Sequence, residues 1–363
     1  MIPVTKPYLP DINKYFEYIN KCYLNQQLTN NGPLVKELKK RLENHLGVKY
    51  LLPVANGTLA LQIAYKTLGI SEKVITTPFT FIATSSSLQW EGIKPIYADI
   101  DPDSLNLSPE KVELALRPDV SAILPVHVYG NPCDVEAFDE IANNNNLKVI
   151  YDGAHAFDVR LHGRSVLEWG DASILSFHAT KVFHTVEGGA VIFKEQEDYE
   201  RACRLINFGY EDRKLLDVGI NAKMSEFHAA MGLCVLDELD TVYNKRKLIH
   251  DVYQNELCSL LQMPKWREGA TRNYSYFPVL FSSEYALLRC QKILNEADIY
   301  PRRYFYPSLD EIFKVQDFDC PVSRDIGRRV LCLPTYPSLS QNDQFDIINL
   351  ICSQIRRNHM VSD

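Results

Sequence analysis

The sequence lacks the features that would assign it to several common classes of protein. No run of roughly 18 or more apolar residues occurs, so we expect no membrane-spanning helix. Residues 1–7 contain no apolar targeting segment. No G-x-G-x-x-G motif is present, which argues against a nicotinamide-binding fold. Basic residues form no cluster, and 39 Lys and Arg stand against 46 Asp and Glu for a net charge of −7, so we expect no nucleic-acid partner.

Disulfides and metal sites are also not expected. The nine cysteines are an odd number, are scattered along the chain and form no C-x-x-C pair, which indicates reduced thiols in a cytoplasmic protein. His127 and His155 have no H-x-x-x-H motif and no Cys/His cluster around them. We therefore predict that the protein binds no metal ion and works in the cytoplasm.

The sequence does contain a regular alternation of strand-like and helix-like segments. A chain of 363 residues exceeds the size at which one hydrophobic core usually stops growing, so two domains are expected. Apolar runs separated by helical patterns predict an α/β fold, a mostly parallel sheet wrapped by helices. These runs lie near Leu51, Val74, Ile96, Ala122 and Val149, and at residues 172–177 and 189–193.

A boundary between the two domains is expected near residue 240. Residues 224–261 have a continuous helical pattern that would carry the chain out of the first domain. The remainder mixes short strand-like and helical segments. We predict a large domain at residues 1–240 and a smaller C-terminal α+β domain at residues 241–363.

Lys181 is the first candidate for chemistry. It follows the strand-like residues 172–177 and precedes Gly188 and Gly189. At this glycine pair we expect a tight turn that leads into the strand-like residues 189–193. This places Lys181 at the carboxyl end of a strand, where α/β folds build their sites. A lysine shielded from water can lose its proton there and form an imine with an aldehyde. Most lysines are ordinary surface residues, so Lys181 alone does not establish this interpretation.

Asp152 favours the chemical interpretation. It ends the apolar residues 149–151 and lies upstream of Lys181. Asp is also common as a helix N-cap, which is the alternative explanation for this position. The aldehyde cofactor pyridoxal phosphate (PLP) needs a lysine for the imine, an anion for its ring nitrogen and donors for its phosphate. Lys181 and Asp152 together provide the first two.

A candidate phosphate site follows the buried strand pattern at residues 51–55. Asn56, Gly57 and Thr58 come next, and a helical apolar pattern begins at Leu59. A strand, a short Gly-containing turn and a helix start present free backbone N–H groups to an anion. Gly57 allows close approach of the backbone, Thr58 adds a hydroxyl group, and Ser176 is a further possible donor. PLP is therefore the predicted cofactor.

The sequence resembles the sugar-nucleotide aminotransferases of the fold type I PLP enzymes, the DegT or StrS family. Seven runs carry this resemblance in the same order along nearly the whole chain: residues 29–33, 56–58, 77–81, 125–130, 152–155, 176–189 and 219–226. Residues 151–157 and 176–181 are most similar to the enzymes that form dTDP-4-amino-4,6-dideoxyglucose. The resemblance implies a large PLP-binding domain followed by a smaller C-terminal domain.

The resemblance also implies a role for each residue that matches the family's motifs. Lys181 would be the Schiff-base lysine and proton shuttle, and Asp152 would pair with the ring nitrogen. His155 would lie near the cofactor's 3′-oxygen. The two faces of the ring would be covered by Phe81 and Ala154. The phosphate would be held by Gly57, Thr58 and Ser176, together with Asn221 of the partner subunit, so the active site would exist only in a homodimer.

The implied substrates are glutamate as amino donor and a nucleotide-linked 4-keto-6-deoxyhexose, in particular dTDP-4-keto-6-deoxyglucose, for the synthesis of a surface glycan. Candidate sugar-nucleotide contacts are Asn31, His184, Arg302 and Arg303. The two arginines precede an aromatic run and could bind a diphosphate, although that run could equally be core of the small domain. Amination at carbon 3 and a PLP-binding regulator without catalysis remain alternatives. A sugar dehydratase of the same fold would carry histidine in place of Lys181.

Overall fold

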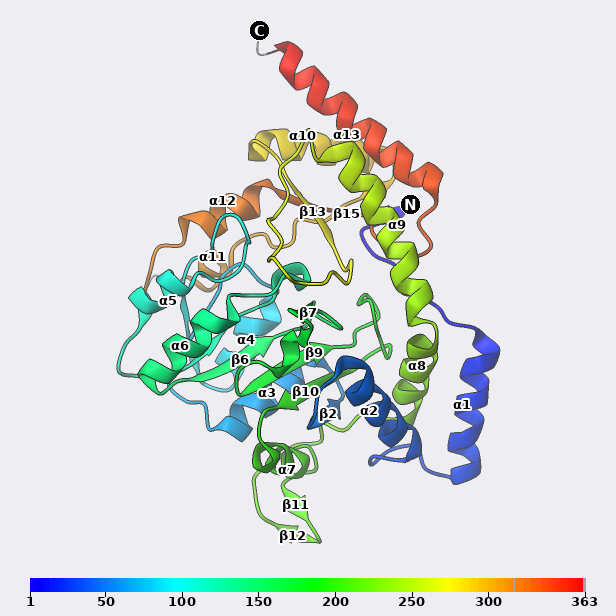
Figure 1. The fold of residues 1–363 in the computed structure, drawn as a ribbon, viewed down its shortest axis with the longest axis vertical. Helices are drawn as coiled ribbons and strands as arrows, with labels where there is room; N and C mark the ends of the chain where they lie inside the picture. Colours follow the sequence, from blue (N-terminus) through cyan, green and yellow to red (C-terminus); the bar gives the residue numbers. More distant parts are fainter. Residues whose placement is uncertain (316, 362–363) are drawn as a thin grey trace.

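The structure is a computed structural model that describes residues 1–315 and 317–361. Its centre is a seven-stranded sheet with the order β2-β10-β9-β6-β5-β3-β4 (Figure 1). Strands β9, β6, β5, β3 and β4 pair in parallel, whereas β10 runs antiparallel to both of its neighbours. The predicted mostly parallel sheet is therefore confirmed. Its strands are β2 (Leu51–Val54), β3 (Lys73–Thr76), β4 (Lys94–Tyr97), β5 (Val120–Leu124), β6 (Lys148–Asp152), β9 (Ala172–Ser176) and β10 (Gly189–Phe193).

Helices cover both faces of this sheet, which explains why its strands are apolar along most of their length. One face packs against α2 (Pro33–Leu46), α5 (Pro109–Ala115), α6 (Val135–Asn145) and α8 (Glu226–Asp237). The other face packs against α3 (Gly57–Leu68), α4 (Ile82–Trp90) and α7 (Gln196–Leu205). The sheet is thus the middle layer of three, and its carboxyl edge remains free to build a site.

Helix α3 begins at the turn that was predicted to bind phosphate. The Asn56 side chain accepts a hydrogen bond from the Leu59 amide at 2.8 Å and so caps the helix. The helix ends at Leu68 and is followed by Gly69, whose φ of 67° is the left-handed conformation that glycine adopts readily. The Asn56 side chain does not bind the amides of Gly57 and Thr58. Both amides lie in the first turn of the helix, where backbone N–H groups have no intrahelical partner.

Two local expectations were wrong. The helical pattern at residues 224–261 is two helices, α8 and α9 (Leu239–Leu257), separated at Glu238, whose φ of −114° and ψ of 11° are not helical. Strands β9 and β10 do pair in an antiparallel manner, but residues 177–188 connect them and there is no tight turn. Lys181 therefore lies in a long connection at the edge of the sheet rather than beside a hairpin turn.

The C-terminal part of the chain has its own hydrophobic core. Strands β13 (Phe277–Leu280) and β15 (Val330–Leu333) pair in an antiparallel manner and pack with α9, α10 (Glu284–Glu296) and α13 (Gln341–Val361). In Figure 1 this core lies above the large sheet. The first strand, β1 (Ile2–Pro3), pairs with β14 (Ile299–Tyr300) and so joins the C-terminal part. The boundary at residue 240 stays a prediction.

The remaining elements are short or peripheral. Helix α1 (Ile12–Asn25) lies beside α8, and the hairpin of β11 (Tyr210–Glu211) and β12 (Lys214–Leu215) projects away from the body (Figure 1). The others are β7 (Arg160–Leu161), β8 (Arg164–Ser165), α11 (Leu309–Phe313), α12 (Pro321–Arg329) and the 3-10 helices Val128–Gly130 and Val166–Glu168. No helix in the described part of the chain is long and apolar enough to cross a membrane.

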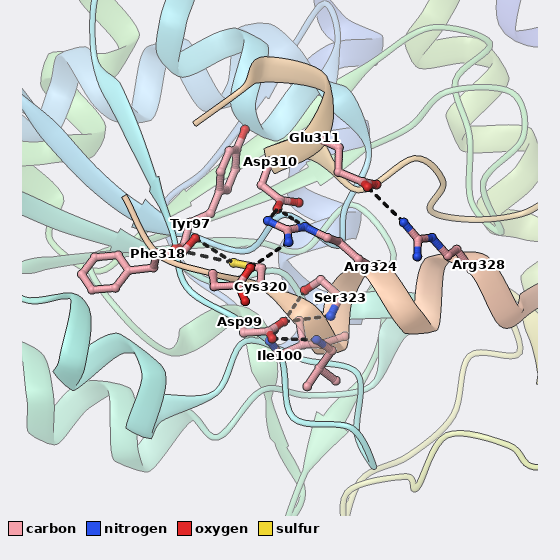
Figure 2. A network of polar contacts seen from close by, with 12 residues as sticks. Tyr97, Asp99, Ile100, Asp310, Glu311, Phe318, Cys320, Ser323, Arg324 and Arg328 are labelled. Atoms are coloured by element: carbon pink, nitrogen blue, oxygen red, sulfur yellow. Dashed lines mark hydrogen bonds and ion pairs between the residues drawn. The ribbon is translucent and has the colours of Figure 1, made fainter. Parts of the chain in front are cut away.

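A buried polar network joins α11 and α12 to the end of β4 (Figure 2). The Asp99 carboxylate accepts hydrogen bonds from the Val322 and Ser323 amides, each at 2.8 Å, and so caps α12. The fully buried Asp310 carboxylate pairs with Arg324 at 2.7 Å. These contacts fix residues 304–313 against the large sheet, and this segment forms one wall of the site described next.

Candidate active site

Eight of the residues predicted to bind the cofactor line one cavity at the carboxyl edge of the sheet. The cavity has a volume of ≈ 330 Å³. The C-terminal part of the chain closes it with Tyr276, Tyr304 and Phe305. The eight residues come from four separate segments, so the fold, and not local sequence, brings them together. They are Gly57, Thr58, Phe81, Asp152, Ala154, His155, Ser176 and Lys181.

Lys181 has the properties of a lysine that can act as a nucleophile. Its Nζ donates a hydrogen bond to the Tyr276 hydroxyl at 3.4 Å. Burial lowers the pKa of the Lys181 amine to about 8, and the nearby Asp152 carboxylate opposes this shift. A substantial share of the amine is then neutral near physiological pH, as imine formation requires.

Asp152 lies at the end of β6, next to the strand that precedes Lys181. One carboxylate oxygen accepts a hydrogen bond from the Thr84 hydroxyl at 2.8 Å, and the other accepts one from the Ala154 amide at 3.1 Å. Burial raises the pKa of the Asp152 carboxyl group, and these two hydrogen bonds together with Lys181 oppose the rise. A protonated ring nitrogen would supply the positive partner that a buried carboxylate needs.

The phosphate end of the cavity is shaped by Gly57. A Cβ atom at this position would lie 3.0 Å from the Ser176 Cβ, so a side chain there would displace Ser176. The two residues and Thr58 thus form a narrow cradle at the start of α3, where backbone N–H groups and the helix dipole favour an anion. The cavity thus has hydrogen-bond donors for a phosphate at one end, a lysine for an aldehyde in the middle and a carboxylate for a ring nitrogen at the other end. This arrangement fits PLP.

His155 lines the cavity as a neutral ring. Its Nδ1 accepts a hydrogen bond from the Tyr129 amide at 3.3 Å, which leaves the proton on Nε2. Burial lowers the pKa of His155 well below its ordinary value. The ring lies parallel to Phe305 at 5.8 Å and edge-on to Tyr276 at 4.8 Å. Of the two predicted ring contacts, Phe81 is 56% exposed and Ala154 is half-buried.

Five predicted residues lie outside this cavity. His184 is buried, and its Nε2 is 2.7 Å from the Tyr8 carbonyl oxygen. Arg303 pairs with Glu284 at 2.7 Å. Arg302 and Arg303 both line a neighbouring cavity of ≈ 370 Å³, which shares Thr80, Phe81, Tyr304 and Phe305 with the first. The other two are Asn31, in the loop before α2, and Asn221, which is exposed in the segment before α8.

The sequence interpretation missed several residues of the site. Thr84, the partner of Asp152, lies in a helix with an unusual run of small polar residues, and that run is the one signal that could have indicated it. Tyr276 and Tyr129 reach the site from segments that look like ordinary core. Asn273 donates hydrogen bonds to the carbonyl oxygens of His155 and Phe157 at 2.8 and 3.0 Å. Tyr129 lies in the run 125–130 that carries the resemblance, but nothing in that run assigns it a role, and no local pattern marks Tyr276 or Asn273.

The fold and the site define a pyridoxal-phosphate enzyme of fold type I. The model of the DegT/DnrJ/EryC1/StrS aminotransferase family matches residues 11–352. The chain belongs to this family, and PLP is its cofactor.

Individual relatives support the same assignment. The chain is 43% identical to a dTDP-4-amino-4,6-dideoxy-D-glucose transaminase of Shigella dysenteriae, over 97% of this chain and 98% of the relative. It is 37% identical to a transaminase of the same description from Escherichia coli, over 98% and 99%. Among solved structures, DesI in the presence of its TDP-sugar product superimposes with a TM-score of 0.94 at 31% identity, covering 99% of this chain and 95% of DesI.

Proposed function

We propose that the enzyme transfers an amino group from glutamate to carbon 4 of dTDP-4-keto-6-deoxyglucose, giving dTDP-4-amino-4,6-dideoxyglucose. The complete set of Lys181, Asp152 and the phosphate cradle in one cavity carries the proposal for catalysis. The choice of sugar rests on the 43% and 37% identity to two transaminases of that description. GDP-perosamine synthases are more distant, at 31% for the Escherichia coli O157:H7 enzyme.

In this proposal each residue of the cavity has a defined task. Lys181 holds the cofactor, is released when the amino donor binds, and then moves a proton with its Nζ. Asp152 keeps a positive charge on the cofactor's ring nitrogen. PLP, when bound, supplies a ring that accepts electrons from the carbon that loses the proton. Gly57, Thr58 and Ser176 hold the phosphate, and neutral His155 offers its Nε2 proton to an oxygen of the cofactor.

Arg302 is the preferred candidate for the diphosphate of the sugar nucleotide. It lines the cavity that continues from the cofactor cavity past Phe81 and Tyr304. A guanidinium group can bind two phosphate oxygens at once. Arg303 is committed to Glu284 and to the ring of Tyr306, whose centroid is 3.5 Å away. Direct substrate contacts for Arg303, Asn31 and His184 stay predictions.

We also propose that the active unit is a homodimer with composite sites. Asn221 does not line the cavity of its own subunit, so a phosphate contact by Asn221 requires a partner subunit. The adjoining segment exposes large apolar side chains that a second copy could cover, with Phe208, Leu215 and Val218 50%, 63% and 93% exposed. A two-fold axis would place the two segments reciprocally.

Mixed dimers test the composite site sharply. Lys181→Ala and Asn221→Asp homodimers should each be inactive. A heterodimer of the two variants should contain one site with an intact Lys181 from one subunit and an intact Asn221 from the other. Mixing, unfolding and refolding the two variants should therefore restore activity. No recovery in dimers shown to be mixed would place Asn221 in its own subunit's site and contradict the proposal.

The cellular setting completes the proposal. All nine cysteines are free, which suits a reducing compartment such as the cytoplasm. Relatives include a spore coat polysaccharide biosynthesis protein of Bacillus subtilis at 29% identity, which supports a role in a surface glycan. Another relative, also 29% identical, is described as a pleiotropic regulatory protein of Geobacillus stearothermophilus. The regulator alternative is therefore included in the test.

The substrate assay separates these alternatives. The enzyme is incubated with glutamate and either dTDP-4-keto-6-deoxyglucose or its 3-keto isomer, with Lys181→Ala as control, and the position of the new amine is read by NMR. We expect amination at carbon 4 by the wild type only. Amination of the 3-keto sugar alone would identify the 3-aminotransferase, and turnover of neither sugar would favour the regulator.

A further inference from the structure

The Tyr276 hydroxyl group is in contact with the amine that carries out the chemistry. It accepts a hydrogen bond from Lys181 Nζ at 3.4 Å, and Nζ lies 5.9 Å from the centre of the Tyr276 ring. Within residues 1–315 and 317–361, Nζ makes this hydrogen bond and no other. The two residues are far apart in sequence: Lys181 lies between β9 and β10, and Tyr276 immediately precedes β13.

The segment that carries Tyr276 is anchored by buried polar contacts. The Asn273 side chain donates to the His155 carbonyl oxygen at 2.8 Å, and Ser275 Oγ donates to Asn273 Oδ1, also at 2.8 Å. The Arg246 guanidinium, only 2% exposed, donates to the carbonyl oxygens of Tyr274 and Ser275 at 3.3 and 3.2 Å. It also donates to the Thr335 carbonyl oxygen at 3.0 Å, and no carboxylate pairs with it among the described residues. Because burying a charged group is costly, a buried guanidinium that binds backbone carbonyl oxygens indicates that this segment is held firmly in one position.

Tyr276 can serve Lys181 in both protonation states of the amine. Burial raises the pKa of the Tyr276 phenol, so its hydroxyl group keeps its proton at neutral pH. The hydroxyl oxygen can accept a hydrogen bond from the ammonium form of Lys181, and its proton can be donated to the neutral amine. The first of these bonds is stronger because the donor is charged.

We propose that Tyr276 is a positioning residue that holds the Lys181 amine over the cofactor site while the amine is not bound to the cofactor; this rests on the proposed function. The Lys181 Nζ lone pair takes a proton from the donor's α-carbon, so that a C–H bond breaks and an N–H bond forms. With the cofactor bound, the electron pair of the C–H bond would be taken up by its ring, and Nζ would then hand the proton to the cofactor carbon that had carried the imine. Tyr276 accepts the N–H hydrogen bond in between and keeps its own proton, so its charge does not change.

The first test uses the apoenzyme and needs no substrate. Lys181 is labelled with a trace of acetic anhydride across pH, and peptide mass spectrometry gives the pH at which its reactivity is half maximal. Tyr276→Phe retains the ring but removes the acceptor, so the midpoint should fall by about one pH unit. Tyr304→Phe, which alters a hydroxyl group of the same cavity, is the matched control and should leave the midpoint unchanged.

A second variant guards against misfolding of the first. Tyr276→His keeps a hydrogen-bonding atom on the ring and should give a midpoint between those of the wild type and Tyr276→Phe. A Tyr276→Phe midpoint equal to that of the wild type would overturn the proposal, as would an equal fall in Tyr304→Phe. These results do not depend on which sugar the enzyme uses, so they are distinct from a failure of the substrate assignment.

The loaded enzyme supplies the second readout. Tyr276→Phe should slow the half-reaction with glutamate about tenfold while the KM for the sugar nucleotide stays within about twofold, because the lost hydrogen bond acts on proton transfer. The isotope effect with α-deuterated glutamate should rise in this variant. A rise in KM with an unchanged half-reaction would assign Tyr276 to sugar binding and overturn the positioning role.

Discussion

In the apoenzyme, Lys181 should react with amine reagents at a pH at which ordinary lysines are inert. Burial lowers the pKa of its amine to about 8. At pH 7 about 9% of an amine with this pKa is neutral, against about 0.04% for a lysine with the usual pKa of about 10.4. Only the neutral amine is nucleophilic, and the neutral fraction of Lys181 should be about 200-fold larger than that of an exposed lysine at this pH.

The assay is competitive labelling with a trace of reagent after PLP has been removed. A lysine-containing reference peptide in the same tube reports the behaviour of an exposed amine. The reactivity of Lys181 should level off above pH 8, whereas that of the reference peptide should still rise. Asp152→Asn provides an internal check of sign: the Asp152 carboxylate raises the pKa of Lys181, so its removal should lower the midpoint further.

The result that refutes this reasoning is a Lys181 midpoint close to that of the reference peptide. Lys181 would then be solvated like a surface residue, and the cavity would not provide the desolvation on which its nucleophilic role depends. A midpoint that rises in Asp152→Asn would show that the carboxylate does not face the amine.

The other predictions concern the cofactor and the fold. Asp152→Asn should keep the fold but lose turnover by a factor on the order of 10² or more in steady-state assays, and near-normal turnover would contradict its role. Gly57→Ala should weaken PLP binding about tenfold in fluorescence titrations, because its Cβ would lie 3.0 Å from the Ser176 Cβ; unchanged affinity would refute the cradle. Asp99→Ala should lower the free energy of unfolding by about 2–4 kcal/mol, since the cap of α12 is lost. Asp319→Ala, which removes a 74%-exposed partner of Arg324, should cost less than about 1 kcal/mol in the same denaturation experiment.

The parts of the site that could be predicted from the sequence follow from the geometry of a parallel sheet. Asp152 ends β6 and Lys181 follows β9, and these two strands are parallel neighbours. Residues at the carboxyl ends of neighbouring parallel strands must lie close together. Two short apolar runs in the sequence were therefore enough to predict that this pair meets at one edge of the sheet. The phosphate turn is even more local, since strand, Gly57 and helix start are contiguous.

The parts that could not be predicted depend on packing between distant segments. Tyr276 lies 95 residues from Lys181, and Thr84 lies 68 residues from Asp152; each is placed by the docking of one layer onto another. Arg303 is an arginine beside an aromatic run, but its partner Glu284 lies on a different element, which no spacing rule indicates. The break at Glu238 was missed because both helices share one apolar periodicity that continues across it.

The most direct test of the account is to find which lysine carries the cofactor. The purified, PLP-loaded enzyme is reduced with borohydride, digested and mapped by mass spectrometry. We expect the pyridoxyl mass on the peptide that contains Lys181, and its complete loss in Lys181→Ala. A pyridoxyl group on any other lysine of the wild-type enzyme, or its persistence in Lys181→Ala, would contradict the central claim that this cavity is the active site.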